Sequence, residues 1–347
     1  MTNAEPHWSD PGVETVAPGV HRLPLPLPMD GLKAVNVYVL ETEDGLTCID
    51  AGWAVDASRK QLEEGLRSIG HGVGDITRFL VTHVHRDHYT QAVTVRRELG
   101  RATIELGIGE KPVLDVLNGG QLDHDPTVTR LVLAGAHDTA AGWRRMFEGA
   151  DPDLEMWASP DVWLEDEQVV EVGDRRLRAV PTPGHTAGHF VFADEKAGVL
   201  FAGDHVLPTI TPSVGFELVP ARDPLGDFMG SLRTVRDRLP DLRLLPAHGA
   251  VTESSHRRAD ELLAHHDRRL ELCLGAVEPA GSTAYDVAQR LTWTRHERAL
   301  AELDVFNTAL ASMETMVHLD LLAFRGQLVR EHVEGTMVYR PAVGEPG

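Results

Sequence analysis

Short apolar runs bounded by Gly, Pro and Asp turns alternate with stretches whose apolar residues recur every three or four positions. The first pattern predicts strands and the second predicts helices, so we expect a mixed α/β fold. The expected strands are residues 20–27, 35–40, 46–49, 78–82, 169–172, 176–180, 189–193, 199–202 and 242–245, and the expected helices are residues 56–69, 89–99, 224–239 and 255–277.

Three regions depart from this alternation. Residues 1–19 are polar and punctuated by Pro and Gly, which predicts a flexible N-terminus. Residues 118–165 lack strand alternation and predict a helical insertion or lid within a main domain at residues 20–277. Residues 278–347 form a separate C-terminal domain, and a length of 347 residues suits about two domains. In this tail we expect a winged-helix pattern, with helices at 282–291, 297–304 and 308–322 and a hairpin of 327–331 with 337–340.

The charge balance narrows the classes of partner. The chain has 33 Lys and Arg against 53 Asp and Glu, a formal net charge of −20. This acidity argues against a binder of phosphate backbones or of anionic membranes, which needs clustered basic residues. We see no signal peptide and no apolar run of about 18 residues. Cys48 and Cys273 are the only cysteines, which suits a reducing compartment, so we expect a cytoplasmic protein.

The chemistry is concentrated in one short segment, residues 82–88, where a predicted strand gives way to a predicted helix. His83 and His85 are two residues apart, so in an extended segment their side chains project to one side. Asp87 and His88 follow as the chain turns into the helix, and can point to a second position nearby. Burying such a cluster without a cation is costly, so the segment predicts a metal site.

Three later segments carry a His or an Asp in a turn that contains Gly, just after a predicted strand. They hold His185, Asp204 and His248. Open α/β sheets collect ligands at the ends of their strands, so we expect these side chains to converge on the first segment.

Together these motifs resemble the metallo-β-lactamase-fold hydrolase superfamily over about residues 20–277. The His-x-His-x-Asp-His motif is matched by residues 83–88, and the later ligand positions by His185, Asp204 and His248. An earlier Asp-x-Gly turn is matched by Asp50. The resemblance implies a four-layer αββα sandwich. The small C-terminal helical domain, winged-helix-like, suggests the lactamase-like-beta and glyoxalase II-like branch.

The resemblance also implies a dinuclear metal centre with two divalent ions. Zinc suits this nitrogen and oxygen ligation, and iron or manganese remain alternatives. Two such ions would hold a hydroxide for attack on a carbonyl, with Asp87 orienting it as a catalytic residue. The implied ligands are His83, His85 and His185 for one ion and Asp87, His88 and His248 for the other, with Asp204 bridging them and Asp50 supporting a ligand from behind.

We therefore expect a metal-dependent hydrolase acting on an ester, thioester or lactone carbonyl of a small molecule. The alternatives are a metal-dependent endoribonuclease, an iron-dependent sulfur dioxygenase and a non-catalytic metal-binding module. Residues 277–347 carry six Arg and Lys against ten Asp and Glu, and residues 308–322 contain Glu314 and Asp320 but no Arg or Lys. This charge disfavours nucleic acid as a partner. We interpret the tail as a packing module or the interface of a homodimer.

The helical insertion offers candidate substrate contacts. Trp143, Phe147 and Trp157 would give an apolar cover near the metal site. Such a cover suits an acyl chain or a lactone, because ligand pockets are mostly apolar. The same aromatic spacing is also typical of core packing within an inserted helix pair, so both interpretations stay open.

Overall fold

The chain forms two compact units, each built from segments that lie far apart in the sequence. The first consists of Met1–Gly120, Asp153–Pro212 and Ser231–Asp260, and the second of Gln121–Pro152, Ser213–Gly230 and Glu261–Gly347. The computed structural model describes residues 7–28, 31–119, 125–149, 153–294 and 296–342.

The larger sheet of the first unit has the strand order β1-β2-β3-β4-β5-β6-β7. Its strands pair antiparallel from β1 to β4 and parallel from β4 to β7. Val39 of β3 lies opposite Cys48 of β4, which fixes the register of the central pair. The strands are β1 (Glu14–Ala17), β2 (Val20–Pro26), β3 (Ala34–Thr42), β4 (Gly45–Ile49), β5 (Ile76–Leu80), β6 (Thr103–Gly107) and β7 (Val162–Leu164).

The smaller sheet of the first unit has the order β12-β11-β10-β9-β8. Only its β11–β12 pair is parallel. Parallel pairing places the carboxyl ends of these two strands side by side, next to the loops that follow them. The strands are β8 (Gln168–Val172), β9 (Arg175–Pro181), β10 (Phe190–Asp194), β11 (Val199–Gly203) and β12 (Arg243–Pro246).

The two sheets pack face to face around one apolar core. The ring of Tyr38 on β3 meets the ring of Phe201 on β11 edge to face, with centroids 5.4 Å apart. Alternate residues of both sheets point into this layer, as expected for a sandwich. Its buried members are Val16, Val20, Tyr38, Leu40, Ile49, Leu80, Leu164, Val170, Val172, Leu177, Ala179, Phe190, Phe192, Val199, Phe201 and Leu245.

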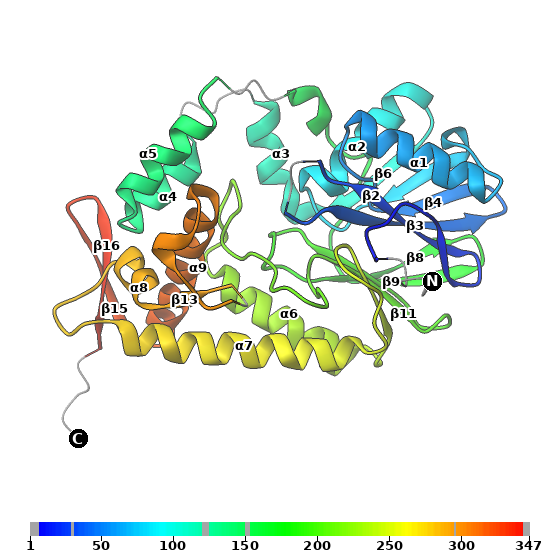
Figure 1. The fold of residues 1–347 in the computed structure, drawn as a ribbon. Coiled ribbons are helices and arrows are strands. Elements are labelled where there is room, and N and C mark those ends of the chain that lie inside the picture. The colour runs from blue at the N-terminus through cyan, green and yellow to red at the C-terminus, as the bar shows by residue number, and fades with distance from the viewer. Residues whose placement is uncertain (1–6, 29–30, 120–124, 150–152, 295, 343–347) are drawn as a thin grey trace, which may run out of the picture. The chain divides into compact units, whose positions relative to one another are not determined.

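Helices cover the outer faces of the sheets, which gives the αββα layers. Figure 1 shows α1 (Asp56–Ser68) and α2 (Arg86–Leu99) on the outer side of the larger sheet. On the smaller sheet, Nη1 of Arg178 donates to the carbonyl of Arg238 at 3.0 Å, which ties β9 to the end of α6 (Pro224–Arg238). The first unit also contains α3 (Lys111–Asn118), η1 (Val73–Asp75), η2 (Ile108–Glu110) and η3 (Leu154–Trp157), together with the start of α7 (Ser255–Ala276).

In the second unit, part of the helical insertion shares a core with the C-terminal tail. Leu131 of α4 and Trp143 of α5 pack with Ala309 and Met313 of α9. These segments are more than 150 positions apart along the chain. The elements are α4 (Pro126–Leu133), α5 (His137–Met146), α8 (Ala284–Arg290), η4 (Leu300–Glu302), α9 (Val305–Phe324) and the hairpins β13 (Thr292–Trp293) with β14 (Arg298–Ala299) and β15 (Leu328–Val333) with β16 (Thr336–Pro341).

The helix expected at residues 297–304 is wrong. The structure has the short hairpin of β13 and β14 and the 3-10 turn η4 there instead. Thr294 and Glu297 adopt left-handed backbone conformations, with φ of 63° and 51°, which a right-handed helix does not tolerate. The three-helix pattern that suggested a winged helix is thus incomplete, and that identity stays a prediction.

Three strands and one α-helix of the first unit were not expected from the sequence. They are β1, β6, β7 and α3. Strand β1 lies within residues 1–19, where we expected a flexible segment, and residues 1–6 of that stretch lie outside the described residues.

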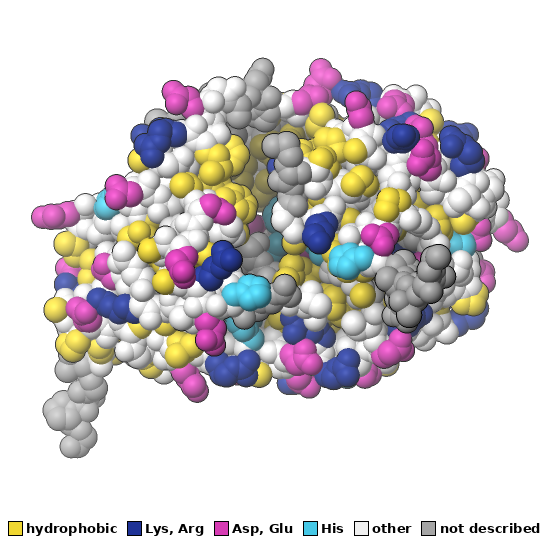
Figure 2. Space-filling view, viewed as in Figure 1, with side chains coloured by type: hydrophobic (Ala, Val, Ile, Leu, Met, Phe, Trp, Pro, Cys, Tyr) yellow, Lys and Arg dark blue, Asp and Glu magenta, His cyan; other side chains and the backbone are white. Residues whose placement is uncertain are grey.

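The surface carries mixed charge on the face drawn in Figure 2. Lys and Arg side chains are interspersed with Asp and Glu, without a continuous basic patch among the described atoms of that face. Among the described residues, no helix combines the length and the apolarity needed to span a bilayer.

Candidate metal centre

The predicted ligands of the first unit converge at the ends of strands. His85 occupies the N-cap position of α2 and has an extended backbone conformation, so Asp87 and His88 fall in the first turn of that helix. His185 lies in the loop between β9 and β10, and Asp204 and His248 follow β11 and β12 almost directly. The loops that carry these residues therefore lie together in the structure, as the sequence predicted.

At two positions, an unusual backbone conformation allows the loops of the candidate site to lie close together. Asp50 directly follows β4 with φ of 59°, and its carboxylate accepts a hydrogen bond from the N–H of Thr82 at 2.8 Å. Gly203 precedes Asp204 with φ of 50°, and a Cβ there would lie 2.6 Å from Nε2 of His189. Only glycine fits this position without displacing its neighbours.

The converging side chains form two groups with the spacing of metal ligands. Within each group, the candidate ligand atoms all lie within 4.8 Å of one another. One group is His83, His85, His185 and Asp204, and the other is Asp87, His88 and His248.

Asp204 faces both groups. Its Oδ2 lies 3.5 Å from Nε2 of His185, in the first group. Its Oδ1 lies 3.4 Å from Nε2 of His248 and 3.7 Å from Nε2 of His88, in the second group. This position fits a carboxylate that bridges two cations.

Several polar atoms at the centre of the cluster are buried without a hydrogen-bond partner. They are Nε2 of His83, His88 and His248 and Oδ1 of Asp204. Leaving such atoms unsatisfied is costly, and a cation coordinated by them would remove that cost. The donor set is nitrogen and oxygen without sulfur, which suits zinc, iron or manganese. The residues present therefore fit the metals that the family resemblance implies.

In three of the histidines, the ring nitrogen Nδ1 contacts a polar group on the side away from the centre of the cluster. Nδ1 of His88 lies 2.8 Å from Oδ2 of Asp50, and Nδ1 of His248 lies 2.8 Å from the carbonyl oxygen of Ala34. Nδ1 of His83 lies 3.0 Å from Oγ1 of Thr82. These contacts fix each ring so that Nε2 points into the cluster, as partners of metal-binding histidines usually do.

Burial and neighbouring charge divide the histidines into two kinds. Burial, together with neighbouring histidines, lowers the pKa of His83 well below its usual range and the pKa of His85 to about 3, the latter against Asp87 and Asp204. Burial also acts to lower the pKa of His88, but Asp50, Asp87 and Asp204 outweigh it and raise that pKa to about 10. The pKa of His248 is raised by Asp204 and Asp87 against burial. Neutral His83 and His85 offer free lone pairs, whereas cation binding at His88 and His248 would release protons.

The two carboxylates of the cluster stay ionised. Burial acts to raise the pKa of Asp87, but His88 and His248 outweigh it, and the pKa lies far below its usual range. Burial likewise opposes the lowered pKa of Asp204, which His248, His88 and His185 produce. Both groups are therefore available as anionic ligands at neutral pH.

A model of the metallo-beta-lactamase superfamily matches residues 30–248, which include all seven predicted ligands. The chain belongs to the metallo-β-lactamase superfamily.

Several curated proteins are similar to part or most of the chain. The lactamase-like protein nscB from Aspergillus fumigatus is 35% identical over 246 residues, 71% of this chain and 57% of that protein. The probable metallo-hydrolase YqjP from Bacillus subtilis is 25% identical over 341 residues, 92% of this chain and 95% of that protein. The atrochrysone carboxyl ACP thioesterase AgnL7 from Paecilomyces divaricatus is 36% identical over 134 residues, 37% of this chain and 40% of that protein. The chain spans between 32% and 57% of the length of the nscB proteins it matches.

A solved structure is similar over nearly the whole chain. The beta-lactamase domain protein from Burkholderia ambifaria matches with a TM-score of 0.80 and 29% identity, covering 98% of this chain and 97% of that one. The similarity includes the tail as well as the superfamily domain.

Two further histidines border this superfamily site without joining either ligand group. Nδ1 of His189 lies 2.9 Å from Oγ1 of Thr182, and its Nε2 accepts from the N–H of Asp204 at 3.2 Å. Burial lowers the pKa of His189 well below its usual range, so the ring is neutral. His205 is also buried, and burial lowers its pKa to about 3. The His189 side chain thus supports the backbone at Asp204.

The aromatic candidates of the insertion fall in different places. Trp143 is 5% exposed in the core of the second unit, where its Nε1 donates to Asp125 at 2.7 Å. This placement corrects the lid interpretation for Trp143 in favour of core packing. Phe147 is 45% exposed, with its ring 4.8 Å from that of Trp143. Trp157 lies in η3 of the first unit. Substrate contact by Phe147 and Trp157 stays a prediction.

Sequence reasoning missed two buried polar residues that hold the ligand loops. Asn36 donates from Nδ2 to the carbonyls of Pro246 and Gly249, both at 2.9 Å, on either side of His248. A polar residue within the apolar run at 35–40 was the available signal. Glu110 is the second residue, and the pattern around it gave no comparable signal.

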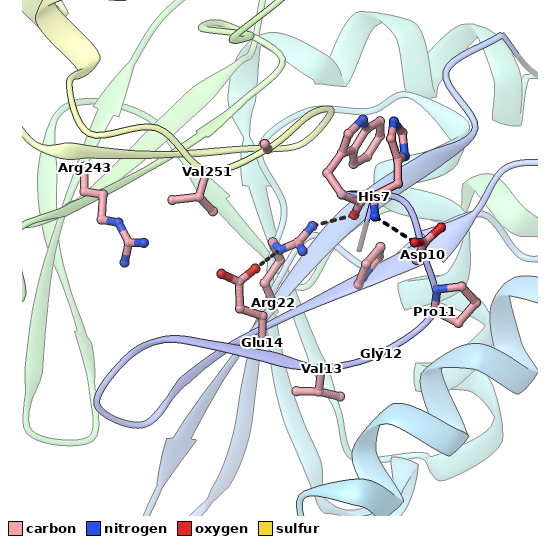
Figure 3. Close-up of a pocket in the computed structure, with 12 residues that line it drawn as sticks. His7, Asp10, Pro11, Gly12, Val13, Glu14, Arg22, Arg243 and Val251 are labelled. Atoms are coloured by element: carbon pink, nitrogen blue, oxygen red, sulfur yellow. Dashed lines mark hydrogen bonds and ion pairs between the residues drawn. The ribbon is translucent and has the colours of Figure 1, made fainter. Parts of the chain in front are cut away.

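A cavity of about 620 Å³ lies beside the N-terminal segment, and none of the predicted ligands lines it (Figure 3). Arg22 extends into this region between Glu14 and the carbonyl of Trp8, at 2.8 and 2.7 Å. The same guanidinium donates to Oδ1 of Asn36 at 2.9 Å. The lining thus connects to the superfamily site through Asn36, but it is separate from the candidate metal centre.

Proposed function

We propose that this protein is a metal-dependent hydrolase that cleaves an ester, thioester or lactone bond in a small acyl compound. The observation that carries the proposal is the position of Asp204, whose two carboxylate oxygens face His185 on one side and His88 and His248 on the other. This arrangement supports a pair of cations close enough to act on one substrate group.

The chain's own residues would hold the cations and keep the site ionised. Two divalent ions, with zinc as the first candidate, would supply positive charge for a carbonyl oxygen and lower the pKa of a water molecule. Asp87, with a 14% exposed side chain, lies at the more open side of its group and would accept a hydrogen bond from that water. Its low pKa keeps the carboxylate an acceptor at neutral pH. The proposed ligand sets are His83, His85, His185 and Asp204 for one ion and Asp87, His88, His248 and Asp204 for the other.

The choice of a small acyl substrate rests on charge and on one relative. The net charge of −20 and the absence of Arg and Lys from α9 both weigh against a polynucleotide. The relative AgnL7 is named as an atrochrysone carboxyl ACP thioesterase. Sequence similarity to that protein covers only 37% of this chain, so it supports a thioester as the first substrate to test.

One set of assays tests the proposal against its alternatives. The purified protein, prepared without chelator, is analysed for metals and offered acyl thioesters, lactones, simple esters, a chromogenic β-lactam and single-stranded RNA. We expect about two transition-metal ions per chain and hydrolysis of at least one carbonyl substrate, abolished by chelator and restored by added Zn²⁺. Protein that holds no transition metal contradicts the proposal.

The remaining outcomes identify the alternative functions. Cleavage of RNA alone would establish the endoribonuclease. Oxygen uptake driven by a persulfide, with bound iron and no hydrolysis, would establish the sulfur dioxygenase. Bound metal without turnover of any of these compounds would indicate a non-catalytic metal-binding module.

A further inference from the structure

Glu110 is a fully buried carboxylate at the end of η2, on the loop that follows β6. Oγ1 of Thr186 donates a short hydrogen bond to its Oε1. The backbone N–H groups of Val84 and Gly188 also hydrogen-bond this carboxylate. One side chain therefore connects two loops that are about 100 positions apart in the sequence.

The backbone around Glu110 is packed too closely for side chains. A Cβ on Gly109 would lie 2.4 Å from the carbonyl oxygen of Ala187, and a Cβ on Gly188 would lie 2.4 Å from the backbone nitrogen of Glu110. A Cβ on Gly107 would meet the carbonyl oxygen of Gly188 at 2.0 Å. These glycines allow the segment 107–110 to lie directly against the 187–188 backbone, which places the Glu110 carboxylate between the loops.

Both loops carry predicted metal ligands immediately beside the atoms that Glu110 binds. Val84 stands between His83 and His85, and Thr186 follows His185. These three histidines belong to one ligand group, together with Asp204. A change in the separation of the two loops would change the distances within that group.

We propose that Glu110 is a positioning residue that holds the His83–His85 segment and the His185 loop at the separation needed to bind one cation. This inference rests on the proposed metal-dependent function, because it concerns the same site. Glu110 acts through the backbone and through Thr186, and it belongs to neither ligand group. Removing it should weaken metal binding by loosening the loops, while the ligand side chains remain.

Charge and shape at Glu110 can be separated by substitution. Burial raises the pKa of Glu110 to about 7, against the hydrogen bonds from Thr186, Val84 and Gly188. Glu110→Gln removes the charge and keeps an acceptor oxygen of the same reach. Glu110→Ala removes the acceptor, and Thr186→Val removes one donor with little change of volume. Glu105→Ala is the matched control, because Glu105 is also a buried carboxylate, lies on β6, and has its side chain paired to Arg78.

The first measurement is Zn²⁺ affinity, determined by competition with a chromophoric chelator. For Glu110→Ala we expect the ion held by His83, His85, His185 and Asp204 to be bound about 10–100-fold more weakly, the usual effect of removing a residue that supports a ligand. Thr186→Val should lose less, and Glu110→Gln and Glu105→Ala should remain within about threefold of wild type. Unchanged affinity in Glu110→Ala, or an equal loss in Glu105→Ala, would overturn the proposal.

The second measurement is independent of metal. Hydrogen–deuterium exchange of the metal-free protein reports the amides of Val84 and Gly188, which should exchange faster in Glu110→Ala than in wild type or Glu105→Ala. Equal exchange in all three proteins would show that Glu110 does not hold the two loops together, even if metal affinity fell. Wild-type protein that binds no metal but shows this protection would instead reject the proposed function, while Glu110 would still be shown to hold the two loops together.

Discussion

Oδ2 of Asp50 lies 2.8 Å from Nδ1 of His88, and both side chains are buried. The other oxygen of Asp50 accepts from the N–H of Thr82, so the carboxylate is fixed at the end of β4. The pair holds the His88 ring with Nε2 facing Asp204. Asp50, which follows β4, thus controls the direction of a ligand that faces Asp204, the residue after β11.

Asp50→Ala should therefore weaken metal binding without removing a ligand. Loss of such a partner typically costs 10–100-fold in metal affinity or activity, and we expect the ion held by Asp87, His88 and His248 to be affected. Metal content after dialysis and chelator competition measure the change. Asp194→Ala is the control, since Asp194 is equally buried but paired with Arg175 in the smaller sheet. Equal affinities in the two variants would mean that Asp50 has no orienting role.

Substitution at His85 and at Asp204 should have different effects on metal content. His85→Ala removes a ligand of one ion only, so about one ion per chain should remain, whereas Asp204→Ala removes a group that faces both clusters and should lower the occupancy of both. Hydrolysis should fall by more than about 100-fold in each variant, the upper end of the loss seen for supporting residues.

Circular dichroism should show that both variants keep the fold, because the sandwich core does not include these residues. His71→Ala, a partly exposed histidine paired with Glu41 on the same unit, should retain both ions and full activity. Activity that survives in either ligand variant would disprove the proposed mechanism.

The convergence of the candidate ligands was predictable because each of them stands just beyond an apolar run. Strand ends can be located from hydrophobic periodicity, and residues such as Asp204 and His248 at those ends point to one site only in combination with the segment 83–88. The αββα layers followed from the same periodicity together with the family resemblance. Strands β6 and β7 were not predicted. They have only five and three residues, and they are the last two strands at one edge of the sheet.

The remaining features depend on contacts that no local pattern records. Nothing around Trp143 indicates that its ring packs with Met313, because the two residues meet only in the folded second unit. Glu110 was equally hidden, since its partners Val84 and Gly188 lie on other loops. In the tail, the left-handed backbone at Glu297 overrode the helical propensity of its neighbours.

Asn36→Leu should destabilise the loop that carries His248. The carbonyl of Pro246 keeps a second donor in the hydroxyl of Tyr38, but the carbonyl of Gly249 loses the Asn36 amide. A buried acceptor left without a donor costs about 1–3 kcal/mol, and we expect the free energy of unfolding to fall by that amount. Urea unfolding measures it. Asn118→Ala provides the comparison, because Asn118 donates to the carbonyl of Trp157 at an exposed position and should change stability by less than about 0.5 kcal/mol. A similar small change in Asn36→Leu would show that the loop does not depend on this amide.

The second unit should lose stability in acid through His318 and His266. Their rings are buried, with Nδ1 of His266 3.2 Å from Nε2 of His318. Burial lowers the pKa of His318 to about 3 and holds that of His266 well below its usual range, with Arg269 and His265 lowering both. In the unfolded chain a histidine has a pKa of about 6.5, so as the pH falls below 6.5 the unfolded state binds more protons than the folded state. Stability is therefore fully present above pH 6.5 and declines as the pH falls towards 3.

At pH 5 the titration of His318 alone lowers the free energy of unfolding by about 2 kcal/mol, since one pH unit corresponds to about 1.4 kcal/mol. His318→Gln removes this titration, so its free energy of unfolding should change by about 2 kcal/mol less than that of wild type between pH 7.5 and pH 5. Urea unfolding at the two pH values gives the difference, and the shared titration of the metal cluster cancels in the comparison. His332→Gln, at an exposed position on β15, should follow the wild-type curve. If the His318→Gln protein lost as much stability in acid as wild type, the ring would have to be protonated in the folded state, and its burial beside His266 could not be the source of the acid sensitivity.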